Sequence, residues 1–488
     1  MGVRFMGICT RETSVEEMGP KERSIYIDQL TPRGGLYTDV QRAVHPKSNS
    51  TWRVSPEPFW MPPHIVWQYE ALGRHLYRFY KAANLLYAQS VRGIQPGWVA
   101  AYLDRGKPEE VIGYGRMNRF KQHLPHVIRP DVIPAVEGMV ATELDSVPGG
   151  IGFTASLGQR YARLGYEIVG GADGMASGFM HMIRSVGGVE DAVLGVVISE
   201  ESSAWRPEMA WLGEVLNGLG LETYVVRPEE ILFSEAGLFV EGAQGRRQID
   251  VLYRFFELFD LRNIPKIDLI LYAIRKGLVK VTPPLKGYLE EKMLMGLFHH
   301  PLLKRFWHSE MGEDTFDFLM QVFPRTWILD PHPLPPYGVI PGLEIDGQAF
   351  TDWQALGRLG QKQRQFVVKP SGFSEQAWGS RGVSVGHDMS EQDWGGVIAA
   401  ALEAFPTTPH ILQEFHTSSR FSVDYYDFNS DQMARFRGRV RFCPYYFVVD
   451  DEPVLSGIQA TVCPPDKKVL HGMVDAVVVP CGIAAGKR

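Results

Sequence analysis

The sequence predicts an α/β protein built from several lobes. Apolar content is 45% and charged content 22%, as in folded domains rather than disordered or fibrous chains. Strand-like apolar runs alternate with helix-like segments between residues 191 and 260, and a second strand–loop–strand–helix–strand unit covers residues 366–416. At roughly 150 residues per folding unit, 488 residues suggest about three units.

Charge and cysteine content narrow the class of partner and the compartment. With 50 Lys and Arg against 56 Asp and Glu, the net charge is −6, which argues against a nucleic-acid backbone or a membrane surface as main partner. The first residues lack a signal-peptide apolar run, and no apolar stretch approaches spanning length. Four scattered cysteines suit a reducing compartment, so we expect a soluble cytoplasmic protein.

The first half of the chain divides into an irregular segment and a mixed unit. Residues 1–62 are rich in Pro, Ser, Thr and Arg and are predicted to be irregular. Residues 63–185 form the next unit. It opens with Leu and aromatic residues at helical spacing over residues 63–92. Two β-rich runs follow at residues 126–133 and 139–144, joined by an acidic turn and followed by a Gly-rich loop and a helix.

Three further units are expected in the second half. Residues 186–282 alternate strands and helices and predict a small parallel-sheet lobe. Residues 283–335 are predicted to form a helical lobe, which a proline-rich linker separates from the last unit, residues 336–488. That unit combines the strand–loop–strand pattern with a C-terminal hairpin, whose turn we place at residues 450–453, and a closing apolar strand.

One lysine has the surroundings of a phosphate ligand. Lys369 ends an apolar strand and is followed by Ser371 and three glycines: Gly372, Gly379 and Gly382. Glycines let backbone amides approach an anion closely, as phosphate binding requires. No Walker sequence is present, so the kinase and GTPase classes that depend on it lose their motif. Taken alone, the segment is equally consistent with a surface lysine beside a flexible loop.

Three carboxylates and a guanidinium lie on the two β-rich runs. Glu143 and Asp145 are two residues apart and therefore share one face of a strand, as do Arg129 and Asp131. A hairpin would bring the two pairs together. Carboxylate oxygens are the ligands that Mg²⁺ prefers, so the set predicts a metal–triphosphate site. The alternative is a surface hairpin with one charged face.

The order of these motifs resembles the ATP-grasp ligases. About 40 residues after Lys369, another apolar strand ends in Gln413 and Glu414, in the manner of the hinge of that fold. Because the carboxylates precede the lysines, the arrangement is similar to the circularly permuted ATP-grasp order of the synthetase domain of the glutathionylspermidine synthase family. There an R-x-D pair is followed about a dozen residues later by E-x-N, and this chain has Asp145 at the Asn position. The segment 146–150 also departs from that family, and the resemblance covers about residues 110–480.

The resemblance implies an ATP-grasp fold with an inserted pre-ATP-grasp-like lobe at residues 186–282. It implies ATP and Mg²⁺ as cofactors, and a carboxylate–amine ligase that forms an amide through an acyl phosphate from small-molecule substrates. By analogy, the metal ligands would be Asp131, Glu143 and Asp145; Arg129 would contact the transferring phosphate; Lys292 and Lys369 the nucleotide phosphates; Gln413 and Glu414 the adenine and ribose; and residues 371–382, with Ser371, Gly372, Gly379 and Gly382, would form a lid.

Weaker candidates lie elsewhere. Arg254 comes near the end of an apolar strand, where α/β sheets bind ligands, and is predicted to contact substrate or phosphate. Glu200, Glu201 and Arg206 follow another strand but suit a capping turn equally well. Lys467, Lys468 and His471 are better explained as a solvated turn. A zinc site from Cys443, Cys463, Cys481 and His471 is disfavoured because no C-x₂-C pair is present, and buried thiols are expected instead.

Two other functional classes keep the same ATP-grasp core. A metabolite kinase or sensor would bind ATP without amine-dependent release of ADP. A non-catalytic scaffold subunit would keep the fold without using the carboxylates. The intact set of three acids and two lysines favours an active ligase, because drift usually removes some members of an unused site.

Overall fold

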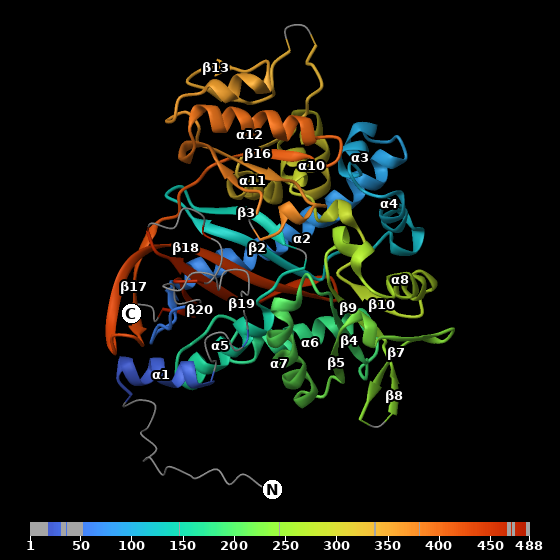
Figure 1. Cartoon of the computed structure of the whole chain (residues 1–488), viewed down its shortest axis with the longest axis vertical. Helices are drawn as coiled ribbons and strands as arrows, with labels where there is room; N and C mark the ends of the chain where they lie inside the picture. Colours follow the sequence, from blue (N-terminus) through green and yellow to red (C-terminus); the bar gives the residue numbers. More distant parts are fainter. Residues whose placement is uncertain are drawn as a thin grey trace.

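The computed structural model describes residues 18–30, 36, 52–145, 147–243, 245–335, 338–379, 381–465, 470 and 474–484. Three larger sheets organise the chain: a central seven-stranded sheet, a four-stranded parallel sheet and a four-stranded antiparallel sheet. In Figure 1, the lobe with α12 and β16 lies above the β2–β3 hairpin, and the α/β lobe with β4, β5 and β9 lies below it. The mixed α/β class predicted from the sequence is confirmed.

The central sheet is built from both ends of the chain. Its order is β1 (Phe59–Met61), β20 (Val477–Ile483), β19 (Glu452–Cys463), β18 (Gln432–Val449), β2 (Val127–Pro134) and β3 (Met139–Asp145), with β17 (Arg420–Asp427) paired to the start of β18. Asp450 and Asp451 join β18 to β19 with φ angles of 49° and 67°, the left-handed conformation of a two-residue hairpin turn. The predicted C-terminal hairpin, turn and closing strand are therefore confirmed.

Helix α2 (Pro63–Val91) covers one face of this sheet, as the spacing of its apolar residues predicts. Its first residue is a proline, which suits the start of a helix because its ring fixes φ near the helical value. Tyr446 of β18 packs so closely on α2 that a Cβ at Gly73 would lie 2.4 Å from the ring. Helices α3 (Gly97–Leu103) and α4 (Glu109–Arg116) follow.

Two helices separate the central sheet from the parallel sheet. They are α5 (Ile151–Arg163) and α6 (Gly174–Gly187), and α6 contacts both β18 and β9. The parallel sheet has the order β10 (Lys280–Thr282), β9 (Val251–Phe255), β4 (Leu194–Ile198), β5 (Thr223–Val226). Helix α7 (Arg206–Gly218) packs on one face and α8 (Ile267–Lys276) on the other. Every residue of β4 and β9 is buried, as expected for a parallel sheet covered on both faces.

The remaining elements surround the candidate site. A small meander, β6 (Leu232–Ser234), β7 (Gly237–Gly242) and β8 (Gly245–Gln248), flanks the parallel sheet, and α9 (Met293–His299), α10 (Lys304–Met311) and α11 (Glu313–Val322) form the helical segment. The antiparallel sheet has the order β11 (Thr326–Ile328), β16 (His410–Glu414), β14 (Phe366–Pro370), β15 (Ser384–Val385), with α12 (Glu391–Ala404) against it. The pair β12 (Glu344–Ile345) and β13 (Gln348–Ala349) lies in the preceding segment. The strand–loop–strand–helix–strand unit predicted here is confirmed.

The N-terminal segment departs from the prediction of irregular chain. Within it the structure has a helix, α1 (Pro20–Leu30), and the edge strand β1, which pairs in parallel with β20. Phe59 of β1 makes edge-to-face contacts with Phe421 and Phe442, at centroid distances of 5.2 and 5.0 Å. A three-residue strand has too little local pattern to be recognised, because partners more than 350 residues away fix it.

The cysteine and membrane predictions have different outcomes. Cys443, Cys463 and Cys481 are buried, as expected, whereas Cys9, Lys467, Lys468 and His471 lie outside the described residues. No helix in the described part of the chain has the length and apolar character to cross a membrane.

A buried lysine ties the parallel-sheet lobe to α2. Lys286 is 1% exposed, and its ammonium donates to Oδ1 of Asn84 and to the carbonyl of His123, both at 2.7 Å, and to the carbonyl of Lys121 at 3.2 Å. Burial lowers the pKa of Lys286 to about 7. The carbonyls and the amide oxygen hold the ammonium in place, and no carboxylate of the described residues pairs with it, so its charge is costly in the folded protein.

We expect Lys286 to make the protein more stable as the pH rises from about 7 to about 10.4. In this window the unfolded chain keeps the proton that the folded protein has released, so the free energy of unfolding increases by up to about 1.4 kcal/mol per pH unit. Urea unfolding at pH 7 and 9 measures the slope. In Lys286→Met this contribution should vanish, and an equal slope in both proteins would contradict the assignment.

Candidate active site

The β2–β3 hairpin presents its charged residues on one face. Its register pairs Arg129 with Asp145 and Asp131 with Glu143. The guanidinium of Arg129 donates to both Asp131 and Asp145. The predicted juxtaposition of one arginine and three carboxylates is therefore present. In this arrangement Arg129 neutralises two of the acids, and it is half-buried between them.

A second arginine, from β18, completes this cluster. Nη1 of Arg441 lies 2.7 Å from Oδ2 of Asp131, so that carboxylate bridges two guanidinium groups. Cys443, two residues further along β18, accepts from Nη1 of Arg129 at 3.3 Å. The sequence analysis missed Arg441 because the pairing of β18 with β2 joins segments more than 300 residues apart. Its only local signal is that arginines alternate along this strand.

The two predicted nucleotide lysines converge on β3. Nζ of Lys292, at the start of α9, lies 2.8 Å from Oε1 of Glu143. Nζ of Lys369, at the end of β14, donates to the carbonyl of Thr142 at 3.2 Å. Burial would raise the pKa of Glu143, but the ammonium groups of Lys292 and Lys369 outweigh it and lower that pKa. Burial lowers the pKa of Lys369 to about 8, against the opposing charge of Glu143.

The two hinge residues differ in their surroundings. Gln413 is buried; its Oε1 accepts from Lys369 at 2.9 Å and its Nε2 donates to Oγ1 of Thr326 at 3.1 Å. Glu414 points to the opposite face of β16, is half-buried, and burial raises its pKa. In this structure Gln413 positions Lys369, and contact of these residues with adenine and ribose stays a prediction.

The loop after Lys369 is fastened at its base. Oγ of Ser371 donates to Glu291 and accepts from the amide of Met293 at 2.9 Å. Glu291 also forms a buried ion pair with Lys107. A Cβ at Gly372 would lie 2.7 Å from the Glu291 carboxyl carbon, so a side chain there would displace the loop base. This buried acid and its lysine partner were not identified from the sequence, although Glu291 directly precedes Lys292.

The far end of the same loop reaches the α/β lobe. Nη1 of Arg381 lies 3.0 Å from Oε1 of Glu201, which follows β4, and the carbonyl of Ala377 accepts from Lys292 at 3.2 Å. Gly379 adopts φ +64°, and a Cβ at Gly382 would lie 2.6 Å from the Pro370 ring. The loop therefore lies across the lysines and contacts both lobes, an arrangement consistent with the predicted lid.

Arg254 has a structural environment rather than an open one. It is fully buried, donates to the carbonyl of Phe256 at 2.6 Å and of Pro284 at 3.3 Å, and forms an ion pair with Glu290. The sequence analysis placed it as a substrate or phosphate contact. In this structure the guanidinium holds Glu290 and the chain after β10 in place, and its contact with substrate or phosphate stays a prediction.

Two acids near Arg254, namely Glu257 and Glu290, were not predicted from the sequence. Burial, with the neighbouring carboxylates of Glu290 and Asp145, raises the pKa of Glu257 to about 8. Burial also raises the pKa of Glu290, although Arg254 opposes the shift. Glu257 follows β9 at the carboxyl end of the parallel sheet, where ligands of α/β proteins bind. The two acids come from different segments of the chain, so only the folded structure shows that they lie close together.

The carboxylates are neutralised by cations rather than gathered as ligands. Among the described residues, no three Asp, Glu, His or Cys side chains are grouped closely enough to hold a metal ion. The ion pairs explain this: Asp131 and Asp145 bind Arg129, and Glu143 binds Lys292. The donor set of three carboxylates on one hairpin face nevertheless has the chemistry that Mg²⁺ requires.

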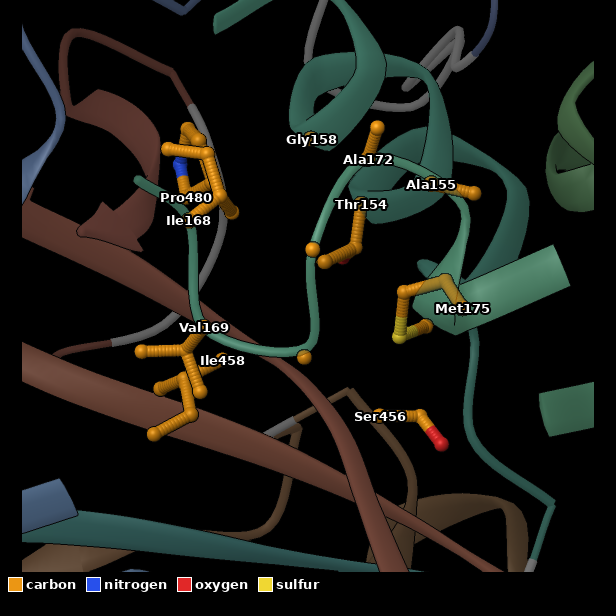
Figure 2. Close-up of a pocket in the computed structure, with 12 residues that line it drawn as sticks. Thr154, Ala155, Gly158, Ile168, Val169, Ala172, Met175, Ser456, Ile458 and Pro480 are labelled. Carbon is orange, nitrogen blue, oxygen red and sulfur yellow. The ribbon is translucent and has the colours of Figure 1, made fainter. Parts of the chain in front are cut away.

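A small cavity lies away from this cluster. It is lined by α5, the segment before α6 and the strands β19 and β20, and Figure 2 shows Met175, Val169 and Ile458 among its lining residues. Its volume of about 10 Å³ is about that of one probe-sized water, and none of the charged residues above lines it.

Comparison with known proteins bears on the fold. No family model matches the sequence, and no curated protein matches it. A glutathione synthetase-like effector from Globodera pallida, in its apo form, is similar in structure, with a TM-score of 0.55 and 10% identity over 96% of this chain and 98% of that chain. A protein assigned as a gamma-glutamylcysteine synthetase from Methylobacillus flagellatus has a TM-score of 0.40 and 11% identity over 81% and 86% of the two chains.

The first of these likenesses covers nearly all of both chains and shows the fold. The ATP-grasp-like architecture predicted from the sequence is thereby confirmed. At 10% identity it shows the fold alone.

Proposed function

We propose that this chain is an ATP- and Mg²⁺-dependent ligase that joins a carboxylate to an amine. Support comes from the ATP-grasp-like fold and from the name of the structural neighbour, a glutathione synthetase-like protein. One observation carries the proposal: Lys292 and Lys369, from separate segments, both reach β3 beside Arg129 and its carboxylates. The cationic and acidic groups needed for phosphoryl transfer thus meet at one place.

The chemistry would proceed in two steps. A carboxylate oxygen of the acid substrate attacks the γ-phosphorus of ATP, and ADP leaves. The amine nitrogen then attacks the acyl carbon, and phosphate leaves as the C–N bond forms and the nitrogen loses a proton. Lys292, Lys369 and Arg129 stabilise the negative charge on the phosphates. The departing phosphate can accept the proton that the amine nitrogen loses, because Glu257, whose pKa burial raises to about 8, is itself largely protonated near neutral pH.

Asp131, Glu143 and Asp145 would hold Mg²⁺, whose positive charge would neutralise the nucleotide phosphates. For this role Arg129 and Lys292 must exchange their carboxylate partners for phosphate oxygens. Nucleotide and metal binding should therefore depend on each other. The phosphate oxygens of the nucleotide accept the hydrogen bonds of Arg129 and Lys292, and the carboxylates that these cations leave are then free to bind the metal.

Thermal unfolding tests this coupling. We expect a non-hydrolysable ATP analogue with Mg²⁺ to raise the unfolding temperature, since a ligand at 100 times its Kd stabilises by about 2.7 kcal/mol. Mg²⁺ alone should have little effect, because cations of the chain already neutralise the acids. Stabilisation by Mg²⁺ alone would contradict the exchange of partners, and no stabilisation by nucleotide would favour the non-catalytic scaffold.

Release of ADP then separates a ligase from a kinase. Acid and amine pairs are screened together and singly at saturating ATP. A ligase needs the amine for sustained ADP release, whereas a metabolite kinase releases ADP with the acceptor alone. Turnover that is indifferent to every amine would therefore replace the ligase proposal by the kinase.

A further inference from the structure

The first part of β18 carries arginines at alternate positions, which therefore share one face. These are Arg437, Arg439 and Arg441, and Arg420 of β17 lies directly opposite Arg439 in the antiparallel register. We call these four residues the arginine row. It starts at the candidate active site, where Arg441 binds Asp131. Residues on one face are about 6.7 Å apart, so the row extends about 13 Å from Arg441 to Arg437.

The chain leaves part of this positive charge unbalanced. Like charges placed directly opposite in an antiparallel pair are destabilising, as at Arg420 and Arg439. Arg420 and Arg437 are exposed, and neither has an ion pair or hydrogen bond within the described residues. By contrast, Arg435 on the same face is bound by Asp424, with Nη2 to Oδ2 at 2.7 Å. Within the described residues, the chain thus supplies an anion at Arg435 and none at Arg420 or Arg437.

Two buried polar atoms at the inner end of the row also lack partners. Thr461 lies opposite Arg441 in the β18–β19 register and is fully buried, yet within the described part of the chain its Oγ1 makes no hydrogen bond. Nε of Arg129 is likewise buried and makes no hydrogen bond within the described residues. Such groups each cost about 1–3 kcal/mol, so an unsatisfied pair beside a cationic row indicates a place for an oxyanion.

We propose that the arginine row binds the acid substrate through oxyanion groups additional to the carboxyl group that is activated. The substrate would be an extended acid with two such groups, carboxylate or phosphate, about 7 and 13 Å along the row from Arg441. That the bound anion is a substrate rests on the proposed ligase function. The binding of an anion to the arginine row does not depend on that function. It makes the preferred acid a polyanion, such as an acidic peptide.

Binding of small anions to the full chain tests the proposal. The probes are triglutamate, trialanine as a neutral peptide with the same terminal carboxylate, and inorganic tripolyphosphate, each measured by calorimetry with and without an ATP analogue and Mg²⁺. We expect triglutamate or tripolyphosphate to bind at least about tenfold more tightly than trialanine. A preference for triglutamate identifies carboxylates as the recognised groups, and a preference for tripolyphosphate with nucleotide present identifies phosphates.

Variants locate the site. The double substitution Arg420→Gln with Arg437→Gln should raise the Kd of the preferred anion about tenfold, and Arg435→Gln, the matched loss of charge on the same face, should change it less than about twofold. Equal affinity for trialanine, or equal losses in both variants, would overturn the proposal. If the protein binds the nucleotide but shows no preference among the anions, the arginine-row proposal fails and the ligase proposal stands. If the protein prefers one anion but does not bind the nucleotide, the ligase proposal fails and the arginine-row proposal stands.

Discussion

Replacing Lys369 by Ala should weaken binding of an ATP analogue about 10- to 100-fold. A charged hydrogen bond contributes about 1.5–3 kcal/mol, and this ammonium ends β14 beside Thr142 and Gln413, where a phosphate can replace the carbonyl and amide acceptors. Isothermal calorimetry with Mg²⁺ measures the Kd. Circular dichroism and urea unfolding show whether the variant is folded.

The matched control for this experiment is Lys362→Ala, which removes an exposed lysine from the same lobe. It should leave the Kd within about twofold. Lys369→Met, which keeps most of the side-chain volume, separates lost charge from lost packing. If Lys369→Ala and Lys369→Met bind the nucleotide as well as the unaltered protein, Lys369 is not a phosphate ligand and the nucleotide site must be sought elsewhere.

The largest loss of stability is expected for Glu208→Ala. Glu208 of α7 is fully buried, and its two oxygens accept from the amides of Gly150 at 2.7 Å and Phe153 at 2.8 Å, at the start of α5. Alanine would leave both amides without an acceptor and open a cavity, which together cost about 3 kcal/mol or more. Urea unfolding measures this difference. Glu214→Ala, an exposed acid on the same helix, should change stability by less than about 0.5 kcal/mol.

Glu208 also predicts a pH dependence with a definite sign. Burial raises its pKa to about 8, whereas an unfolded glutamate titrates near 4.3. The folded protein therefore holds a proton that the unfolded chain has lost between these values, and stability should fall as the pH rises from about 4.3 to 8. Glu208→Gln carries no titrating group and should show a smaller slope. Equal slopes for the two proteins would mean that Glu208 is ionised in the folded state.

The candidate site shows where sequence reasoning succeeded. Alternation along two short strands was enough to place Arg129, Asp131, Glu143 and Asp145 on one hairpin face, because side-chain direction in a strand has a period of two residues. In the same way, an apolar strand followed by a glycine-rich loop was enough to place Lys369 near the end of β14. Local rules of this kind depend only on neighbouring residues.

The contacts that the sequence did not predict share a physical cause. Arg441 reaches Asp131 only because β18 pairs with β2, and Glu208 accepts from α5 only because two helices pack together. Arg254 donates to the carbonyl of Pro284 only because β9 and the chain after β10 lie side by side. The partners in each case come from distant segments, and no local pattern encodes which ones meet.

The sequence by itself therefore determined most of the elements after residue 62, the ATP-grasp-like architecture and the placement of the hairpin acids on one face. Only the tertiary structure decided which charges neutralise one another, that Gln413 holds Lys369, and that no acid of the described residues pairs with Arg420 or Arg437. The reason is that secondary structure follows from local periodicity, whereas the pairing and burial of charges depend on long-range packing, which sets both the distance between groups and their access to water.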